Sequence, residues 1–439
     1  MRAFVDHSLL QSPPAQPCRV EFMPPSWGAA EFAALARAMM GATHDRADLE
    51  KAACLCWNVP YALAVNLGRS AMALGLRAAG LREGEEVILP AFVCRTVAQA
   101  VLEAGGVPVF ADVDEHFNLS PESVERCLSA RTRAVLMVHQ YGRLADVDAL
   151  RSLARQHDLI LVDDAAVATG TAWRGVMAGA WGDFGVVSFN EGKNLQAGGG
   201  GLLLTHHRHI FEAAASDLPE PSSDAMWRTA WQVWHRVKRP LTQSRGYRAA
   251  KSLFKRKKEE GLQTPPVTVA DFYRQVDGIP PEWWGASHIP AEYRAVTASR
   301  LHFIPQRMNG AQAAIACVQL QRLDEIVRSM TERARWLTEQ LSSIPDLALP
   351  HGQFPQHVYS YYTLRLLRGS RYALARHLSE QGIQTQWTFY PLHKQERFAG
   401  YRRDHLPRTE KLWQQTLSLP VHPASDVQYV AEKVREFFE

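Results

Sequence analysis

The stretch Leu159-Ile-Leu-Val-Asp-Asp-Ala-Ala166 is followed by Val186-Val-Ser-Phe-Asn-Glu-Gly-Lys193-Asn-Leu-Gln-Ala-Gly-Gly-Gly-Gly201. Each stretch opens with an apolar run, which ends in two acids in the first and leads to a serine, a lysine and four glycines in the second. Runs that are apolar throughout are typical of strands covered on both faces. Ligands of α/β sheets gather at the carboxyl ends of the strands, so we expect Asp164, Ser188 and Lys193 at or just beyond such ends.

The same rhythm of apolar runs and helical patterns extends from about Val65 to Thr205. The runs lie at 87–90, 107–110, 134–139, 159–163, 185–189 and 201–205, and amphipathic stretches lie at 96–105, 121–130 and 146–157. This alternation predicts an α/β fold with a mostly parallel sheet wrapped by helices. A helix is predicted to resume near Gln312, and a C-terminal α/β unit is predicted with a strand at 361–366 and helices at 371–381 and 426–438. We therefore predict a large domain at 1–325 and a small domain at 326–439.

The composition is that of an ordinary globular protein of 439 residues, with 46% apolar and 21% charged residues. A net charge of +4 is too small at this length to suggest general nucleic-acid binding. No apolar stretch approaches the ~20 residues of a membrane span, and the N-terminus has no signal-peptide hydrophobic region. The six cysteines are scattered and complete no zinc site. We therefore expect a cytoplasmic protein with reduced thiols and no metal.

A lysine amine and a strand-end carboxylate are the two groups that pyridoxal 5'-phosphate (PLP) needs. The amine of Lys193 would form the Schiff base, and the carboxylate of Asp164 would keep the pyridine nitrogen protonated. Successive strand residues point to opposite faces, so Asp163 and Asp164 cannot both face the ring. Ordinary alternatives exist for both groups, because lysines beside glycines are common in surface turns and an aspartate can cap the next helix.

Other residues complete the predicted cofactor site. The segment Gly68-Arg69-Ser70 precedes a helix predicted at 71–79, and a helix start with free N–H groups suits a phosphate. An ordinary N-cap by Ser70 is the alternative. The hydroxyl of Ser188 would donate to the same phosphate or merely cap a strand end. Ala166 is small enough for the ring to lie against it, and the glycines would let the backbone pass close to the cofactor.

The composition of the sequence changes near His206, where basic residues and tryptophans become frequent. From Trp227 to Lys258 the chain has eleven Lys or Arg and no Asp or Glu, with Trp227, Trp231 and Trp234 at helical spacing. We favour a helix that buries this tryptophan stripe in the core. The alternatives are a basic lid over the diphosphate of a nucleotide-linked substrate, and an in-plane membrane contact.

Taken together, these segments resemble the DegT-type family of PLP fold type I enzymes, the nucleotide-sugar aminotransferases. The resemblance implies an insertion between about residues 206 and 300, which interrupts the similarity. The matching stretches include Gly84-Glu-Glu-Val-Ile-Leu-Pro-Ala91, Gly106-Val-Pro-Val-Phe-Ala-Asp-Val-Asp114, Val138-His-Gln-Tyr-Gly142, Ser188-Phe-Asn-Glu-Gly-Lys193 and Leu406-Pro-Arg-Thr-Glu-Lys411. The resemblance implies that Lys193 is the Schiff-base lysine, Asp164 the pyridine-nitrogen partner and Ser188 a phosphate ligand. It also implies a homodimer with active sites at the subunit interface, and a lysine rather than a histidine at this position favours transamination over dehydration.

The chain departs from the usual residues of this family at several positions. Val167 stands where the family has a glutamine near the ring oxygen, and Cys94 stands at the position of the ring-stacking aromatic residue. Pro305 replaces the asparagine that reaches the phosphate of the neighbouring subunit. The usual Ser-Gly-Thr reads Leu67-Gly68-Arg69, and the usual His-Tyr reads Thr388-Phe389. These departures bear on the substrate more than on cofactor binding.

The sequence therefore predicts a PLP-dependent aminotransferase that moves an amino group from glutamate or glutamine to a keto sugar. The sugar would be linked to a nucleotide, or would belong to a polysaccharide or secondary-metabolite pathway. Candidate substrate residues are His393, Tyr390 and Asn190. His139 is a further polar candidate, although a strand-end histidine is commonly structural. Two alternatives are a PLP-dependent lyase, dehydratase or ring-forming enzyme on another substrate, and a PLP-binding regulator that has lost turnover.

Overall fold

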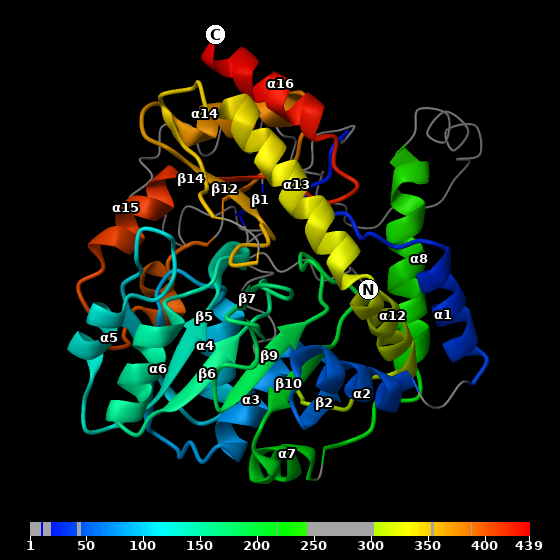
Figure 1. Cartoon of the computed structure of the whole chain (residues 1–439), viewed down its shortest axis with the longest axis vertical. Coiled ribbons are helices and arrows are strands. Elements are labelled where there is room, and N and C mark those ends of the chain that lie inside the picture. Colours follow the sequence, from blue (N-terminus) through cyan, green and yellow to red (C-terminus); the bar gives the residue numbers. More distant parts are fainter. Residues whose placement is uncertain are drawn as a thin grey trace, which may run out of the picture.

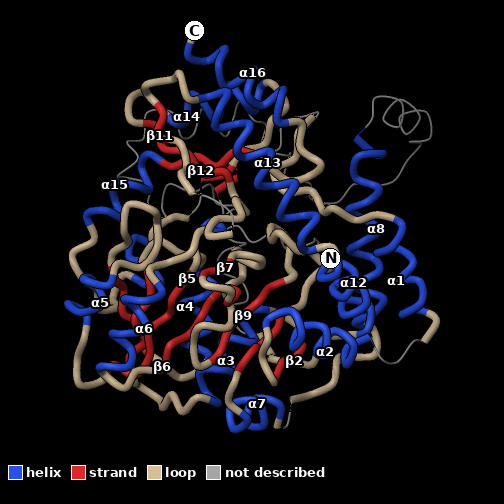
Figure 2. The backbone as a smooth tube through the Cα atoms, in the orientation of Figure 1, coloured by secondary structure: helices blue, strands red, loops and turns tan. Residues whose placement is uncertain are grey.

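The computed structural model describes residues 10–11, 19–41, 45–216, 218–243, 303–352, 355–387 and 389–439. Cys18, Thr388 and the 244–300 part of the predicted insertion lie outside the described residues. Figure 1 shows a large unit below and a smaller unit above it, each built around its own sheet, and Figure 2 shows the helices that surround the two sheets.

The large unit is built on a seven-stranded sheet with the strand order β2-β10-β9-β6-β5-β3-β4. Its strands are β2 (Tyr61–Val65), β3 (Glu86–Pro90), β4 (Val107–Ala111), β5 (Thr132–Val138), β6 (Ile160–Asp164), β9 (Phe184–Ser188) and β10 (Gly201–Thr205). Strand β10 is antiparallel to both of its neighbours, and the other neighbouring pairs are parallel. The predicted α/β fold with a mostly parallel sheet is confirmed, and β2 is the strand of this sheet that the sequence pattern missed.

Residues along each strand alternate between two helical layers. In β3, Val87 and Leu89 pack into one layer and Ile88 packs into the other. The first layer consists of α3 (Gly68–Ala78), α4 (Arg95–Glu103) and α7 (Arg208–Ala215). The second consists of α2 (Asp45–Trp57), α5 (Pro121–Cys127), α6 (Val147–Gln156) and α12 (Gly310–Gln321), with α1 (Ala29–Met39) packed on α12. The predicted helices at 96–105, 121–130 and 146–157 are confirmed, with ends that differ by a few residues.

The smaller unit has a five-stranded antiparallel sheet with the strand order β1-β13-β14-β12-β11. Its strands are β1 (Leu10–Gln11), β11 (Leu347–Ala348), β12 (Tyr362–Leu366), β13 (Gln386–Trp387) and β14 (Thr416–Leu419). Its helices are α14 (Arg371–Glu380), α15 (Pro407–Gln415) and α16 (Val427–Phe438). The predicted C-terminal strand and both predicted helices are present.

Helix α13 (Leu323–Leu341) connects the two units. Its first half places Ile326 and Met330 in the core of the large unit, and its second half places Leu337 and Leu341 in the core of the smaller one. The predicted domain division at 325/326 thus falls within this helix. Shorter elements are the hairpin of β7 (Ala172–Trp173) and β8 (Val176–Met177) and the 3-10 turns at Gln140–Gly142, Leu392–Lys394 and Glu396–Phe398.

Helix α8 (Ala225–Gln243) packs against α12 and α1 at the side of the large unit (Figure 1). The preferred interpretation of its tryptophan stripe is wrong, because these side chains are exposed. The buried side of the helix carries smaller residues at helical spacing, namely Ala225, Thr229 and Val233. The exposed fractions of the tryptophans are 70% for Trp227, 61% for Trp231 and 58% for Trp234.

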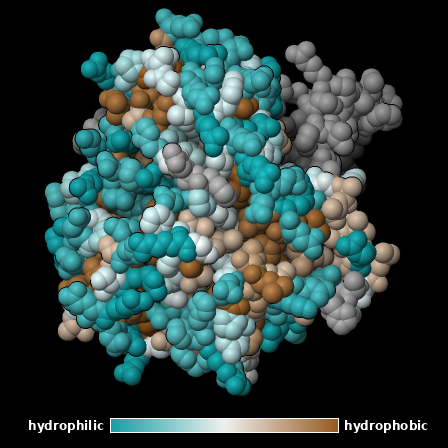
Figure 3. All heavy atoms as spheres, in the orientation of Figure 1, coloured by the Kyte–Doolittle hydropathy of each residue, from teal (hydrophilic) through white to brown (hydrophobic). Residues whose placement is uncertain are grey.

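No helix in the described ranges is both long and apolar enough to cross a membrane. The face in Figure 3 is largely hydrophilic, and hydrophobic side chains show on it as scattered patches. Five cysteines of the described residues carry free thiols, as expected: Cys54, Cys56, Cys94, Cys127 and Cys317.

Candidate active site

The two acids at the end of β6 face opposite sides of the sheet. Asp163 faces the second helical layer, where its Oδ1 accepts a hydrogen bond from His139 Nε2 at 2.8 Å. Its Oδ2 accepts the backbone N–H groups of Gly179 and Trp181, each at 2.8 Å. His139 Nδ1 accepts the N–H of Ala145 at 3.0 Å, so Nε2 carries the proton. Asp163 and His139 therefore form a buried structural pair.

Asp164 faces the layer of α3, on the same side as Val162. The residue is 4% exposed, and its Oδ1 accepts the N–H of Ala166 at 2.9 Å. Burial raises the pKa of Asp164, while the Ala166 N–H, the Lys193 ammonium and His139 oppose this rise. The charge of the Lys193 ammonium thus favours the ionised form of Asp164. A protonated ring nitrogen is the kind of partner that would favour this desolvated carboxylate, so the site fits PLP.

Ser188 and the start of α3 meet on the same side of the sheet. Ser188 ends β9 beside Val186, which packs into the α3 layer. A Cβ at Gly68 would lie 2.9 Å from Ser188 Cβ and 3.3 Å from the Val187 carbonyl oxygen. Only glycine permits this approach. The N-cap of α3 is Leu67, so the alternative of an N-cap by Ser70 is wrong and Ser70 lies in the first helical turn.

The first turn of α3 has the groups that a phosphate requires. Ser70 Oγ is fully buried and has no hydrogen-bond partner within the described part of the chain. The guanidinium of half-buried Arg69 lies 5.1 Å from the centre of the Phe303 ring. A buried hydroxyl without a partner is costly, so a ligand that accepts its hydrogen bond would be stabilised there.

Lys193 lies in a turn between β9 and the glycine run, and this turn is fixed from several sides. Tyr361 of the smaller unit donates its hydroxyl hydrogen to the Gly192 carbonyl at 2.9 Å. Other bonds to the turn are Asn194 Nδ2 to Thr169 O at 2.6 Å, Trp27 Nε1 to Gln196 O at 2.7 Å and Gln196 N to Gln319 Oε1 at 3.2 Å. Sequence reasoning missed Tyr361 and Trp27, because no local pattern indicates which distant carbonyl a side chain reaches.

The glycine run contacts other parts of the protein. Gly200 has a φ of +100°, and a Cβ there would lie 2.5 Å from Met308 Cε. A Cβ at Gly201 would lie 2.5 Å from the backbone nitrogen of Gly68. Gly200 and Gly201 thus have a packing role, which sets β10 against the start of α3, and the expectation that the glycine run makes room for the cofactor stays a prediction.

The remaining predicted site residues occupy varied positions. Cys94 precedes α4, and its sulfur atom lies 3.1 Å from Thr96 Oγ1. Ala166 is half-buried, and Asn190 is exposed with its N–H directed to Ser188 Oγ at 3.4 Å. Val167 is buried.

Two candidate substrate residues make their contacts within the C-terminal part of the chain. His393 Nε2 bonds to Glu410 Oε1 at 2.9 Å, and burial lowers the pKa of His393 while Glu410 opposes this. Tyr390 packs edge-on against Trp413 at 5.1 Å, and burial raises its pKa to about 12. The segment that contains Pro305 runs beside β2, where Asn66 N donates to Gln306 O at 2.9 Å and Met308 N donates to Ala64 O at 3.0 Å.

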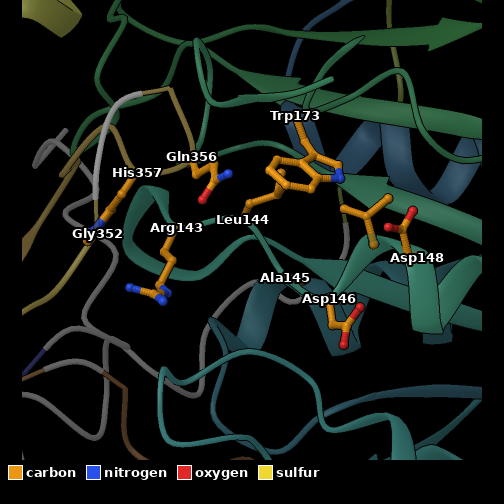
Figure 4. A pocket seen from close by; sticks show the side chains of 10 residues that line it. Arg143, Leu144, Ala145, Asp146, Asp148, Trp173, Gly352, Gln356 and His357 are labelled. Carbon is orange, nitrogen blue, oxygen red and sulfur yellow. The ribbon is translucent and has the colours of Figure 1, made fainter. Parts of the chain in front are cut away.

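A separate pocket of about 210 Å³ lies between the segment Arg143–Asp148, Trp173 and residues near His357 (Figure 4). Its lining includes Gln356 and Asp146, the residue that caps α6. None of its lining residues is among those predicted to bind the cofactor. Asp164, Ser188 and the start of α3, which lie on one side of the sheet, do not line this pocket.

Comparison with known proteins identifies the family. The model of the DegT/DnrJ/EryC1/StrS aminotransferase family matches residues 31–243 and 299–435, which narrows the insertion from about 206–300 to the stretch between these ranges. A pleiotropic regulatory protein of Geobacillus stearothermophilus is 30% identical, over 84% of this chain and 83% of its own length. A GDP-perosamine synthase of Caulobacter vibrioides is 28% identical, over 85% and 84%.

A solved structure is also similar to this chain in sequence and in fold. S. venezuelae DesV, in complex with a ketimine intermediate, is 27% identical and matches with a TM-score of 0.71 over 96% of this chain and 99% of its own. The chain therefore belongs to the DegT/DnrJ/EryC1/StrS aminotransferase family and is a PLP-dependent aminotransferase.

Proposed function

We propose that this enzyme transfers an amino group from glutamate or glutamine to a keto sugar that is linked to a nucleotide. The observation that carries the proposal is that Asp164, Ser188 and the buried hydroxyl of Ser70 lie on one side of the sheet at the start of α3, with Lys193 five residues beyond Ser188. The choice of acceptor is supported by relatives named for nucleotide sugars, among them the GDP-perosamine synthase and a dTDP-4-dehydro-2,3,6-trideoxy-D-glucose 4-aminotransferase of Saccharopolyspora spinosa, 29% identical over 85% of this chain.

In this proposal each residue has a defined task. When bound, PLP supplies an electron sink for the carbon that carries the amino group. Asp164 holds a proton on the pyridine nitrogen, and Ser188, Ser70 and the first N–H groups of α3 hold the phosphate. Lys193 Nζ would hold the cofactor and would move a proton at the substrate carbon. We also propose a cytoplasmic homodimer with its active sites at the subunit interface, and candidate roles in substrate binding for His393, Tyr390 and Asn190.

The test uses Lys193→Ala with Lys51→Ala as a matched control, because Lys51 is an exposed lysine of α2. The wild-type protein and Lys51→Ala should absorb in the visible after incubation with PLP, and glutamate or glutamine should bleach this band. Lys193→Ala should lose both the band and the half-reaction. A normal half-reaction in Lys193→Ala would refute the role of Lys193. GDP- and dTDP-linked 4-keto sugars should then restore the band in the wild-type protein.

A second candidate function is a PLP-binding regulator without turnover. It is favoured by the relative named as a pleiotropic regulatory protein and by Val167 and Cys94, which replace the family's usual glutamine and aromatic residue. This candidate predicts the visible band without bleaching by any common amino acid. Bleaching by glutamate would exclude it.

A further inference from the structure

The pocket of about 210 Å³ in Figure 4 lies between the two units, and the proposed reaction does not use it. The large unit contributes the segment between β5 and α6, the start of α6 and β7, and the smaller unit contributes residues of the segment before β12. Backbone hydrogen bonds join these walls, from Leu144 N to Gln356 O at 2.9 Å and from Ala172 N to Pro355 O at 2.7 Å. The pocket is therefore built into the contact between the units.

Arg143 places a positive charge in the lining, and no carboxylate in the described part of the chain forms an ion pair with it. Its half-buried guanidinium donates a hydrogen bond to the His351 carbonyl. Burial lowers the pKa of Arg143, and the charges of Asp114 and Glu115 oppose this. Because removal from water disfavours a cation that has no partner of opposite charge, an anionic group beside Arg143 would be stabilised.

His357 adds no second positive charge. The residue is 3% exposed, and burial, together with the charge of Arg143, lowers its pKa to about 3. Its ring stacks on that of Tyr359, with 3.8 Å between the ring centres. Among the described residues that line the pocket, Arg143 is therefore the one cation, and a single carboxylate suits its guanidinium.

The start of α6 gives another part of the lining a negative charge. Asp146 caps this helix through Oδ1, which accepts the Ala149 N–H at 3.0 Å, and Asp148 Oδ2 lies 3.2 Å from Arg174 Nη2. The ring of Trp173 lies nearby and has the Arg174 guanidinium 5.2 Å from its centre. Carboxylates and an indole ring both attract cations, so an ammonium group suits this part of the pocket.

The two kinds of charge favour a ligand that carries both signs. Figure 4 shows the head groups of Arg143 and Asp146 well apart from each other. A simple anion would lie near the carboxylates of α6, and a simple amine would leave Arg143 without a counter-charge. The volume is below the roughly 300–1,000 Å³ of pockets for drug-sized ligands, so the ligand is small.

We propose that this pocket binds a small amino acid zwitterion, with its carboxylate at Arg143 and its ammonium group at Asp146. The lining contains none of the residues that would hold PLP, so this site is separate from the proposed active site.

The experiment is isothermal titration calorimetry of the PLP-loaded full-length protein with 5-aminovalerate, whose two charges lie at opposite ends. Arg143→Ala should bind this probe at least about tenfold more weakly than the wild type, because a hydrogen-bonded charge partner is lost. Asp146→Asn keeps a side-chain oxygen that can cap α6, and should bind about two- to fivefold more weakly. The control is Arg37→Ala, which removes an exposed arginine of α1 and should bind as the wild type does.

The probe can be compared with valerate and pentylamine, each of which lacks one of its charges. Both should bind the wild type at least about threefold more weakly than 5-aminovalerate does. Lys193→Ala should bind the probe as tightly as the wild type, which keeps this test independent of the proposed function. Unchanged affinity in both Arg143→Ala and Asp146→Asn would overturn the proposal. So would loss of binding in Lys193→Ala, or valerate or inorganic phosphate binding as tightly as the probe.

Discussion

Asp163 and Asp164 are adjacent in the chain, but Asp163 has structural hydrogen bonds and Asp164 lies at the proposed cofactor site. Because side chains alternate along a strand, Asp163 points to one side of the sheet, where it accepts hydrogen bonds from His139 and two backbone N–H groups. Asp164 points to the other side, where the start of α3 lies and where the charge of Lys193 acts on it. The pleat alone predicted that the two could not share one face. The alternation could not predict the hydrogen-bond partners of Asp163, because these donors come from the segment near Gly179 and from the end of another strand.

This division predicts opposite phenotypes for the two acids. Asp163→Ala leaves a buried histidine and two N–H groups without their acceptor, and should lower the free energy of unfolding by about 3–5 kcal/mol. Asp164→Asn should unfold at nearly the wild-type urea concentration, yet slow the glutamate half-reaction at least about a hundredfold. Urea titrations and stopped-flow spectra measure both quantities. A variant of Asp163 that is as stable as the wild type would contradict the structural role.

Tyr361 offers a test of how firmly the Lys193 turn is held. Tyr361→Phe removes the hydrogen bond to the Gly192 carbonyl, which is worth about 1 kcal/mol. If the turn depends on it, the half-reaction with glutamate should slow roughly fivefold. Tyr359→Phe is the matched control, because Tyr359 donates to the Gly352 carbonyl at 2.7 Å, away from the turn. Equal half-reaction rates in the two variants would show that Tyr361 only stabilises the fold.

At the scale of elements, local patterns determine that a helix or strand forms but not which of its sides is buried. Helix α8 has two rows at helical spacing, the tryptophans and the smaller Ala225, Thr229 and Val233. The larger row is the one that hydrophobicity favours for burial, yet α12 packs on the smaller one. The glycine run shows the same limit, since its partners at Gly68 and Met308 come from remote parts of the sequence.

The close packing of β10 against the start of α3 can be tested by adding one methyl group at a glycine of β10. Gly201→Ala would place a Cβ 2.5 Å from the Gly68 nitrogen, so the helix start must shift away from Ser188. We expect the free energy of unfolding to fall by about 1–3 kcal/mol and the affinity for PLP to fall with it. Gly400→Ala, whose Cβ would meet nothing within 4 Å, should change stability by less than about 0.5 kcal/mol. Matching urea midpoints for the two variants would refute this packing role.

At the scale of the whole molecule, the C-terminal segment is fastened to the edge of the large sheet. Phe110 of β4 exchanges backbone hydrogen bonds with Arg402 and Asp404, at 3.0 and 2.9 Å. Asp112 accepts the N–H groups of Arg408 and Thr409 at the start of α15, at 3.0 and 2.8 Å. These contacts join segments far apart in sequence, so no periodicity could have predicted them. They fix α15 of the smaller unit to β4.

Two ion pairs at this junction make its strength depend on pH. Arg402 Nη2 lies 2.7 Å from Glu86 Oε2, and Arg126 Nη2 lies 2.7 Å from Asp404 Oδ2. Burial raises the pKa of each carboxyl group, but the hydrogen bonds from arginine and serine outweigh it, so both pKa values lie below their ordinary values of 4.5 and 3.8. A carboxyl group with a lowered pKa stabilises the folded state fully above its unfolded pKa, and this contribution disappears as the pH falls through the folded pKa.

We therefore expect Glu86→Gln/Asp404→Asn to be less stable than the wild type at neutral pH, and to approach it as the pH falls below these ordinary carboxyl values. Urea midpoints across this range give the difference directly, and the control is Glu115→Gln, which removes an exposed carboxylate away from the junction. Because α15 is fastened to β4 at this junction, proteolysis between Tyr401 and Pro407 should accelerate in the double variant at neutral pH. A stability difference that stays constant down to the lowest pH would show that shape and hydrogen bonding, rather than charge, hold the smaller unit in place.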